Sequence, residues 1–99
     1  MSFYVYIVAS RPYGTLYIGH TDDLSRRIFE HRENVRPGFT AKYAVTRLVW
    51  FEAFESRENA FRRERQMKEW RRKWKIELIE KMNPLWDDLY EQINDLLAF

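Results

Sequence analysis

The sequence predicts a single α/β domain with a further helix packed on it at the C-terminal end. Three short stretches, residues 3–9, 15–19 and 46–54, are dense in the aromatic and β-branched residues that favour strands. Elsewhere apolar side chains recur every three or four residues, which is the spacing of one helix face. Because no repeat or low-complexity linker interrupts the chain, we expect residues 1–83 to form the domain and residues 84–99 an acidic helix on the same domain.

The first two stretches predict a β-hairpin with a loop of about five residues. Strand alternation places Tyr4 and Tyr6 on one face of the first strand, and Tyr17 shares a face with Gly19 on the second. We therefore expect the three tyrosines to face one way. Gly19 ends the second strand, which indicates a backbone bend or a point where a ligand approaches the main chain.

The next segment turns through Asp22 and Asp23, residues typical of a helix N-cap, into a helix that we expect to end near residue 32 or 34. The residues that share its inward face are Leu24, Ile28 and His31. Arg27 falls on that face too. A guanidinium is always charged and is costly to bury unless an anion meets it. Arg27 therefore predicts a nearby carboxylate, phosphate or substrate group.

Downstream, a loop at residues 36–40 is followed by a short helical turn at residues 42–45 and by the third strand. Ser56 predicts the N-cap of a second helix. The residues that share the inward face of this helix are Ala60, Phe61, Glu64, Met67 and Lys68. Glu64 is therefore a second charge on an inward face.

Residues 70–75 either continue this second helix or kink it, and an apolar stripe then predicts a third helix that ends at Met82. The pair Asn83-Pro84 breaks the chain, because a residue before proline disfavours the helical region. The apolar residues spaced as a final amphipathic helix are Leu85, Trp86, Leu89, Ile93, Leu96 and Leu97.

The composition indicates a packed core without disulfide cross-links. Hydrophobic residues make up 45% of the chain, and the lack of cysteine excludes disulfides and thiolate metal sites. No apolar run approaches the roughly 18 residues that span a bilayer, so we expect a cytoplasmic protein with no membrane partner. The charge is uneven: residues 1–82 carry 17 basic and 11 acidic side chains, and residues 83–99 carry four acidic and no basic ones. The excess of basic side chains in residues 1–82 could attract a polyanion, although such charges also serve solubility.

The hairpin tyrosines, Arg27 and Glu64 together indicate a phosphodiester site. A planar cationic donor suits a phosphorus centre whose oxygens gain charge in the transition state. A lone carboxylate suits Mg²⁺, which keeps several waters and needs only one or two protein carboxylates. A phenol whose pKa falls could act as a general base through a water. His20 and His31 are candidate proton carriers or phosphate donors.

Each of these residues also has a structural interpretation. Arg27 and Glu64 could form an ion pair with each other, and tyrosines are common on half-buried sheets. His20, just past a strand end, could be an exposed loop residue, and His31 could be a capping or packing histidine.

The most basic segment, residues 57–75, holds nine Lys or Arg against three Glu. Such a run is usually a solvated helix face, and its two tryptophans, Trp70 and Trp74, more often pack than stack on bases. The same face could also contact phosphates.

Ten residues separate Tyr4-Val5-Tyr6 from Tyr17-Ile18-Gly19, Arg27 follows Tyr17 by ten positions, and a helical Glu64 comes later. This spacing resembles that of the GIY-YIG nuclease superfamily. The first motif keeps only its third residue, because tyrosine and valine replace the usual glycine and isoleucine. The resemblance covers about residues 3–83, and its second half is similar to the small stand-alone bacterial branch.

This resemblance implies a three-stranded antiparallel sheet flanked by helices, one divalent ion, Mg²⁺ or Mn²⁺, and hydrolysis of a nucleic-acid phosphodiester. Tyr6 and Tyr17 take the positions of the two motif tyrosines, of which usually the second helps to deprotonate the attacking water. Arg27 takes the position of the arginine that stabilises the phosphorane, and Glu64 that of the metal-binding glutamate. The remaining matches are His20, where relatives often place a lysine or polar group, His31, where some have histidine, and Asn83, for a late asparagine.

We therefore expect a metal-dependent endonuclease that acts on nucleic acid, namely DNA in repair or recombination, and that needs no small-molecule cofactor. The expected nucleic-acid contacts are Arg26, Lys42, Arg63, Lys68 and Arg71. Two alternatives stay open: a catalytically idle nucleic-acid-binding module, and an interaction module whose C-terminal helix docks a protein or a second copy of the chain. That helix could also cover the basic groove until substrate arrives.

Overall fold

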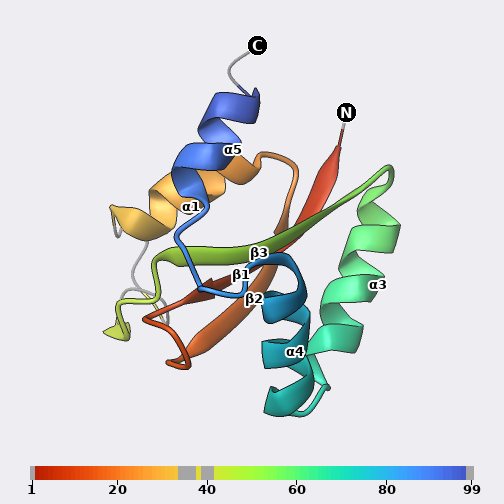
Figure 1. The fold of residues 1–99 in the computed structure, drawn as a ribbon. Coiled ribbons are helices and arrows are strands. Elements are labelled where there is room, and N and C mark those ends of the chain that lie inside the picture. The colour runs from red at the N-terminus through yellow and green to blue at the C-terminus, as the bar shows by residue number, and fades with distance from the viewer. Residues whose placement is uncertain (1, 34–37, 39–41, 98–99) are drawn as a thin grey trace.

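The computed structural model describes residues 2–33, 38 and 42–97, and it contains a three-stranded antiparallel sheet between two layers of helices (Figure 1). The strands are β1 (Phe3–Ala9), β2 (Leu16–Thr21) and β3 (Arg47–Phe54), in the order β2-β1-β3. β1 is therefore central, and β2 is an edge strand. The predicted fold class is confirmed. β2 runs on through His20 and Thr21, beyond its expected end, because it keeps pairing with β1 as far as Tyr4.

Among the described residues, two helices cover each face of the sheet. α1 (Leu24–Arg32) and α5 (Tyr90–Leu97) lie on one face, and α3 (Arg57–Lys68) and α4 (Arg72–Met82) on the other (Figure 1). Each pair of helices covers its own cluster of buried side chains. The cluster under α1 and α5 comprises Tyr6, Val8, Leu24, Ile28, Val45, Leu48, Leu89 and Ile93. The cluster under α3 and α4 comprises Val5, Ile7, Ala9, Ile18, Val49, Trp50, Ala60, Met67, Ile79 and Trp86.

Both predicted N-caps are confirmed by hydrogen bonds. The side chains of Asp23 and Ser56 each accept from the third backbone N–H after them, at 3.2 and 3.1 Å. The basic run does not form one helix, because it breaks between α3 and α4. Trp70, in the break, packs on the core, whereas Trp74 is half exposed.

The segment before β3 is described in part. Of the loop expected at residues 36–40, only Gly38 is among the described residues. The helical turn expected at residues 42–45 is not formed, because Lys42 is the last helical residue before β3 and residues 43 and 44 form a turn. The Lys42 N–H donates back to the Gly38 carbonyl at 2.9 Å. Ala44, two residues on, has a left-handed backbone (φ 54°), which ends helical geometry there.

The C-terminal helix begins later than the sequence predicts, at Tyr90 instead of residue 85. Trp86 is buried with a left-handed backbone (φ 58°), and Leu85 is 77% exposed. The Asn83 side chain donates to the Asp87 carbonyl and accepts from the Asp87 N–H, at 2.8 and 3.0 Å. These bonds satisfy the backbone in an irregular conformation, so the apolar spacing of residues 85–89 does not produce a helix.

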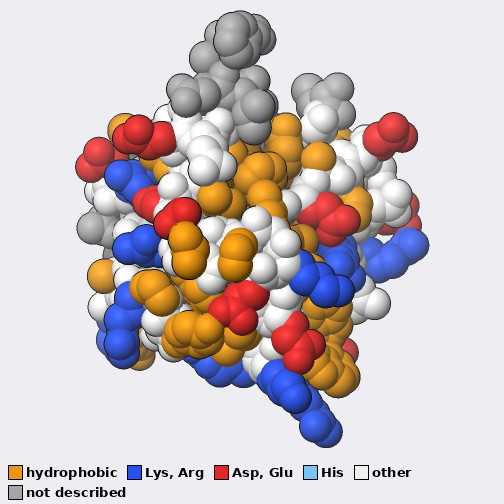
Figure 2. Space-filling model, viewed as in Figure 1, with side chains coloured by type: hydrophobic (Ala, Val, Ile, Leu, Met, Phe, Trp, Pro, Cys, Tyr) orange, Lys and Arg blue, Asp and Glu red, His pale blue; other side chains and the backbone are white. Residues whose placement is uncertain are grey.

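Charged and apolar side chains are interspersed on the face drawn in Figure 2. Two residues predicted to face inward on α3, Phe61 and Lys68, are exposed, because only Ala60, Glu64 and Met67 of that helix reach the interior. Within the described ranges, no helix has the length and apolar character needed to cross a membrane.

Candidate active site

The candidate site forms at the edge strand β2, where side chains from both helical layers meet. Tyr6 and Tyr17 pack with the α1 layer, whereas His20, on the opposite face of β2, meets α3. Tyr6 lies directly opposite Gly19, and a β-carbon on Gly19 would stand 2.6 Å from Tyr6 Cζ. The missing side chain at Gly19 therefore makes room for the Tyr6 ring, and β2 continues past Gly19 and does not end there in a bend.

Tyr6 and His31 form a buried pair next to Tyr17. The Tyr6 hydroxyl lies 3.0 Å from His31 Nε2, and the His31 ring centroid is 5.7 Å from each tyrosine ring. Burial raises the pKa of Tyr6 to about 12, against the opposing effect of the Arg27 guanidinium. Burial, helped by Arg27, lowers the pKa of His31 to about 4. The hydroxyl and the imidazole are therefore both neutral and share this hydrogen bond, so Tyr6 is not a phenol whose pKa falls.

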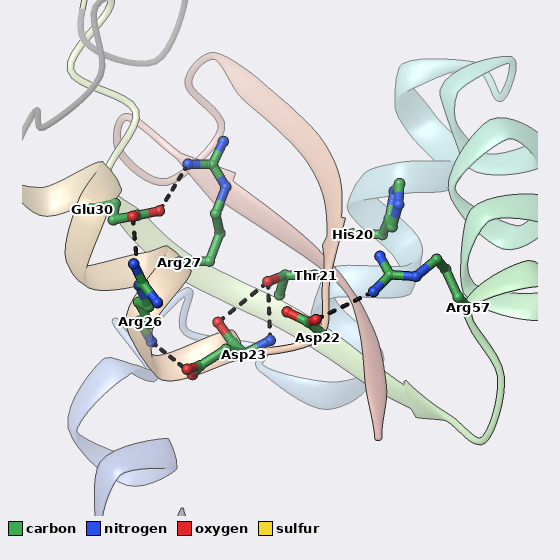
Figure 3. A pocket seen from close by; sticks show the side chains of 8 residues that line it. All are labelled: His20, Thr21, Asp22, Asp23, Arg26, Arg27, Glu30 and Arg57. Atoms are coloured by element: carbon green, nitrogen blue, oxygen red, sulfur yellow. Dashed lines mark hydrogen bonds and ion pairs between the residues drawn. The ribbon is translucent and has the colours of Figure 1, made fainter. Parts of the chain in front are cut away.

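Arg27 projects from α1 into a pocket of about 430 Å³ beside β2 (Figure 3). Its Nη1 donates to Glu30 Oε1 at 3.3 Å. Burial acts to lower the pKa of Arg27, but Tyr6 and Glu30 outweigh it, so the pKa is raised and the guanidinium stays charged. We call this the arginine pocket. Its lining residues are His20, Thr21, Asp22, Asp23, Arg26, Arg27, Glu30 and Arg57.

Glu64 is 6% exposed, and both of its carboxylate oxygens have partners. Oε1 is bonded to His20 Nδ1, and Oε2 accepts from Lys68 Nζ at 2.9 Å. Burial acts to raise the pKa of Glu64, but His20 and Lys68 hold it below its ordinary value, so the carboxylate is ionised. His20 is a half-buried strand residue and not an exposed loop residue, because β2 carries it to Glu64.

The two inward charges do not pair with each other. Arg27 pairs with Glu30, and Glu64 pairs with Lys68 and His20, so the structural ion pair considered from the sequence is wrong. Arg27 and Glu64 nevertheless both act electrostatically on the Tyr6 hydroxyl, where Arg27 lowers its pKa and Glu64 raises it. A permanent cation and an ionised carboxylate are thus held around one buried phenol.

A divalent ion at this site would rest on Glu64. Within the described residues, no three or more His, Asp or Glu side chains are grouped so that they could hold a metal ion. Mg²⁺ keeps several waters and accepts a single carboxylate, and each carboxylate oxygen offers a second lone pair. The residues therefore fit one hydrated hard cation and do not fit a closed all-protein site.

The five predicted nucleic-acid contacts do not gather in one place. Arg26 lines the arginine pocket, and Lys68 pairs with Glu64. Arg63 pairs with a β3 carboxylate at 3.4 Å, Arg71 immediately precedes α4, and Lys42 is exposed ahead of β3. These last three line neither the arginine pocket nor the pocket beside Tyr17.

Three charged residues near the site were not singled out from the sequence: Glu30, Arg57 and Lys75. Glu30 holds Arg27, and Arg57 pairs with Asp22 at 3.2 Å in the arginine pocket (Figure 3). Lys75 lines the pocket beside Tyr17. The spacing of three residues between Arg27 and Glu30 could have revealed the first, whereas the other two depend on how helices dock.

Asn83 has a structural role. It is 5% exposed, and its amide also donates to the Val49 carbonyl of β3 at 3.2 Å. Together with the two bonds to Asp87, this contact means that both the nitrogen and the oxygen of the Asn83 amide are hydrogen-bonded to main-chain groups. Nothing in this arrangement supports a place for Asn83 in the site.

The three-stranded sheet and the residues gathered at its β2 edge define the class of protein. Residues 2–77 match the family described as the GIY-YIG catalytic domain, and the chain belongs to that family. Within it, the chain is similar to UPF0213 proteins. It is 40% identical over 81 residues to one from Staphylococcus haemolyticus, covering 78% of this chain and 93% of that protein. It is 38% identical over 77 residues to one from Haloquadratum walsbyi, covering 78% and 85%.

A solved structure agrees with the fold. The solution NMR structure of a UPF0213 protein from Bacillus halodurans has a TM-score of 0.55 to this chain and 32% sequence identity. The match covers 92% of this chain and 96% of that one. The resemblance recognised from the motif spacing is therefore confirmed at the level of family and fold.

Proposed function

We propose that this protein is a divalent-metal-dependent endonuclease that hydrolyses phosphodiester bonds of DNA, with repair or recombination intermediates as substrates. The observation that supports the proposal is the convergence of Tyr6, Tyr17, Arg27 and Glu64 at the edge of β2, with Arg27 and Glu64 both acting on one buried hydroxyl. Membership of a nuclease family supports the general class of activity.

In the proposed reaction, Arg27 binds the non-bridging oxygens of the scissile phosphate and stabilises the charge that they gain in the transition state. Tyr17, as its phenolate, takes a proton from the attacking water, whose oxygen bonds to phosphorus as the bond to the leaving oxygen breaks. Tyr17 and not Tyr6 is assigned this role because the raised pKa of Tyr6 keeps its hydroxyl protonated. Glu64 would hold the divalent ion, which would supply further positive charge near the phosphate. His20 orients the Glu64 carboxylate through its bond to Oε1.

The test is a cleavage assay with branched, nicked and single-stranded DNA and RNA in Mg²⁺ or Mn²⁺. We expect Glu64→Ala and Arg27→Ala to lose at least about 100-fold in rate, as expected when one transition-state contact is removed. Glu58→Ala is the matched control, since Glu58 lies on the same helix with a side chain that is 77% exposed. Equal cleavage by wild type and both site variants would overturn the assignment.

A catalytically idle nucleic-acid-binding module is the second candidate. The pairing of both Glu64 oxygens favours it, because Lys68 already supplies the positive charge that a metal ion would otherwise bring. This candidate predicts salt-sensitive binding without turnover in either metal, and unchanged binding by Glu64→Ala. The same assay, run beside a binding titration, distinguishes the two.

A further inference from the structure

A second pocket, of about 380 Å³, adjoins the candidate active site at the edge of β2. We call it the lysine pocket, and its lining residues are Leu16, Tyr17, Ile18, Lys68 and Lys75. Tyr17 and Lys68 also belong to the candidate site. Lys68 Nζ is 2.9 Å from Glu64 Oε2 and 5.9 Å from the centroid of the Tyr17 ring. The lysine pocket therefore borders the candidate site through Tyr17 and Lys68.

Lys75 reaches this pocket because the first turn of α4 is anchored to the hairpin loop. Arg72 Nη2 donates to the carbonyls of Tyr13 and Gly14, at 2.7 and 2.6 Å. Lys75 lies about one helical turn further along the same side of α4. β2 begins two residues after Gly14, so these hydrogen bonds place Lys75 beside Leu16.

The two pockets differ in charge. The arginine pocket is lined by three arginines and three carboxylates, which balance, and its arginines are paired within it (Figure 3). The lysine pocket is lined by two lysines and by no acidic residue. Lys68 shares its charge with Glu64, whereas Lys75 forms no ion pair within the described part of the chain. An anion therefore finds a net attraction in the lysine pocket, where Lys75 is the cation with no competing carboxylate.

We propose that the lysine pocket binds a phosphate that flanks the scissile one on a nucleic-acid strand, with Lys75 as the contact. Leu16 and Ile18 provide an apolar floor on which the sugar can pack. Such a contact positions the strand without reading its sequence. The inference rests on the proposed function, because a flanking phosphate presupposes a scissile phosphate bound at Arg27.

The test measures binding of the whole chain to fluorescein-labelled single-stranded and duplex DNA by anisotropy in EDTA, between about 50 and 300 mM salt. Lys75→Gln removes the charge, and Lys75→Arg keeps it. Lys73→Gln is the matched control, because Lys73 is exposed on the same helix and does not line the pocket. Circular dichroism of all variants verifies that they are folded.

We expect Lys75→Gln to flatten the slope of log affinity against log salt by about 0.7–0.9 and to weaken binding at 0.1 M salt by roughly five- to eightfold. Lys75→Arg should keep the slope, and Lys73→Gln should change it by less than half as much. Equal effects of Lys75→Gln and Lys73→Gln would overturn the inference, and so would a wild-type protein that binds no nucleic acid.

The outcomes also separate this inference from the proposed function. A wild-type protein that cleaves DNA while Lys75→Gln leaves the salt slope unchanged retains the function and loses the lysine pocket as a subsite. A wild-type protein that never cleaves, but whose binding depends on Lys75 and not on Lys73, retains the binding site and loses the nuclease.

Discussion

Replacing Gly19 with alanine is expected to destabilise the protein by displacing Tyr6. A β-carbon on Gly19 stands 2.6 Å from Tyr6 Cζ, so the ring must move by about 0.8 Å to reach an ordinary contact of 3.4 Å. The ring has little freedom to move, because Tyr6 is 1% exposed and its hydroxyl is bonded to His31. Overpacking costs about 1–3 kcal/mol, and weakening a buried hydrogen bond adds about 1 kcal/mol. The free energy of unfolding should therefore fall by about 2–4 kcal/mol.

The sign of this effect is diagnostic, because alanine in a strand is ordinarily better than glycine by about 0.5–1 kcal/mol. Urea denaturation followed by circular dichroism measures the change. Tyr6→Ala supplies the matched background, since it removes the ring that blocks the β-carbon, and there Gly19→Ala should be neutral or stabilising. An unchanged stability of Gly19→Ala in the wild-type background, or an equal cost in both backgrounds, would refute the steric explanation.

Three further predictions concern buried side chains. The pKa of His31 is lowered from 6.5 to about 4, so between these values the unfolded chain binds a proton that the folded chain does not. The free energy of unfolding should therefore fall by about 2 kcal/mol from pH 7 to pH 5. In urea denaturation at these two pH values, His31→Gln should remove most of this difference. Ile93→Ala, in the core under α5, should cost about 2–4 kcal/mol, whereas Leu85→Ala should cost less than about 0.5. Equal costs in urea denaturation would mean that α5 is not part of the core. Asn83→Ala leaves buried main-chain groups unpaired and should cost about 2–3 kcal/mol, and a variant with wild-type thermal stability would contradict this.

Most elements could be predicted because their signals are short in range. Strand alternation placed the hairpin tyrosines on one face, and the N-caps at Asp23 and Ser56 depend on residues only three positions away. Prediction failed where the backbone takes distant partners. Residues 84–89 have helical apolar spacing, but Asn83 and β3 hold that segment in another conformation. His20 continues β2 because it pairs with a residue of β1, which no local pattern encodes.

By itself the sequence determined most of the side chains that turn inward, with Phe61 and Lys68 as exceptions, because helix and strand periods are local properties of the chain. It identified Arg27 and Glu64 as charges on inward faces, and the structure half buries the first and buries the second. Only the tertiary structure decided their partners, Glu30 for Arg27 and His20 with Lys68 for Glu64. Both pockets likewise depend on helices that dock against an edge strand from opposite faces. The choice of partner depends on contacts between segments far apart in the chain, and the local spacing of residues does not encode these contacts.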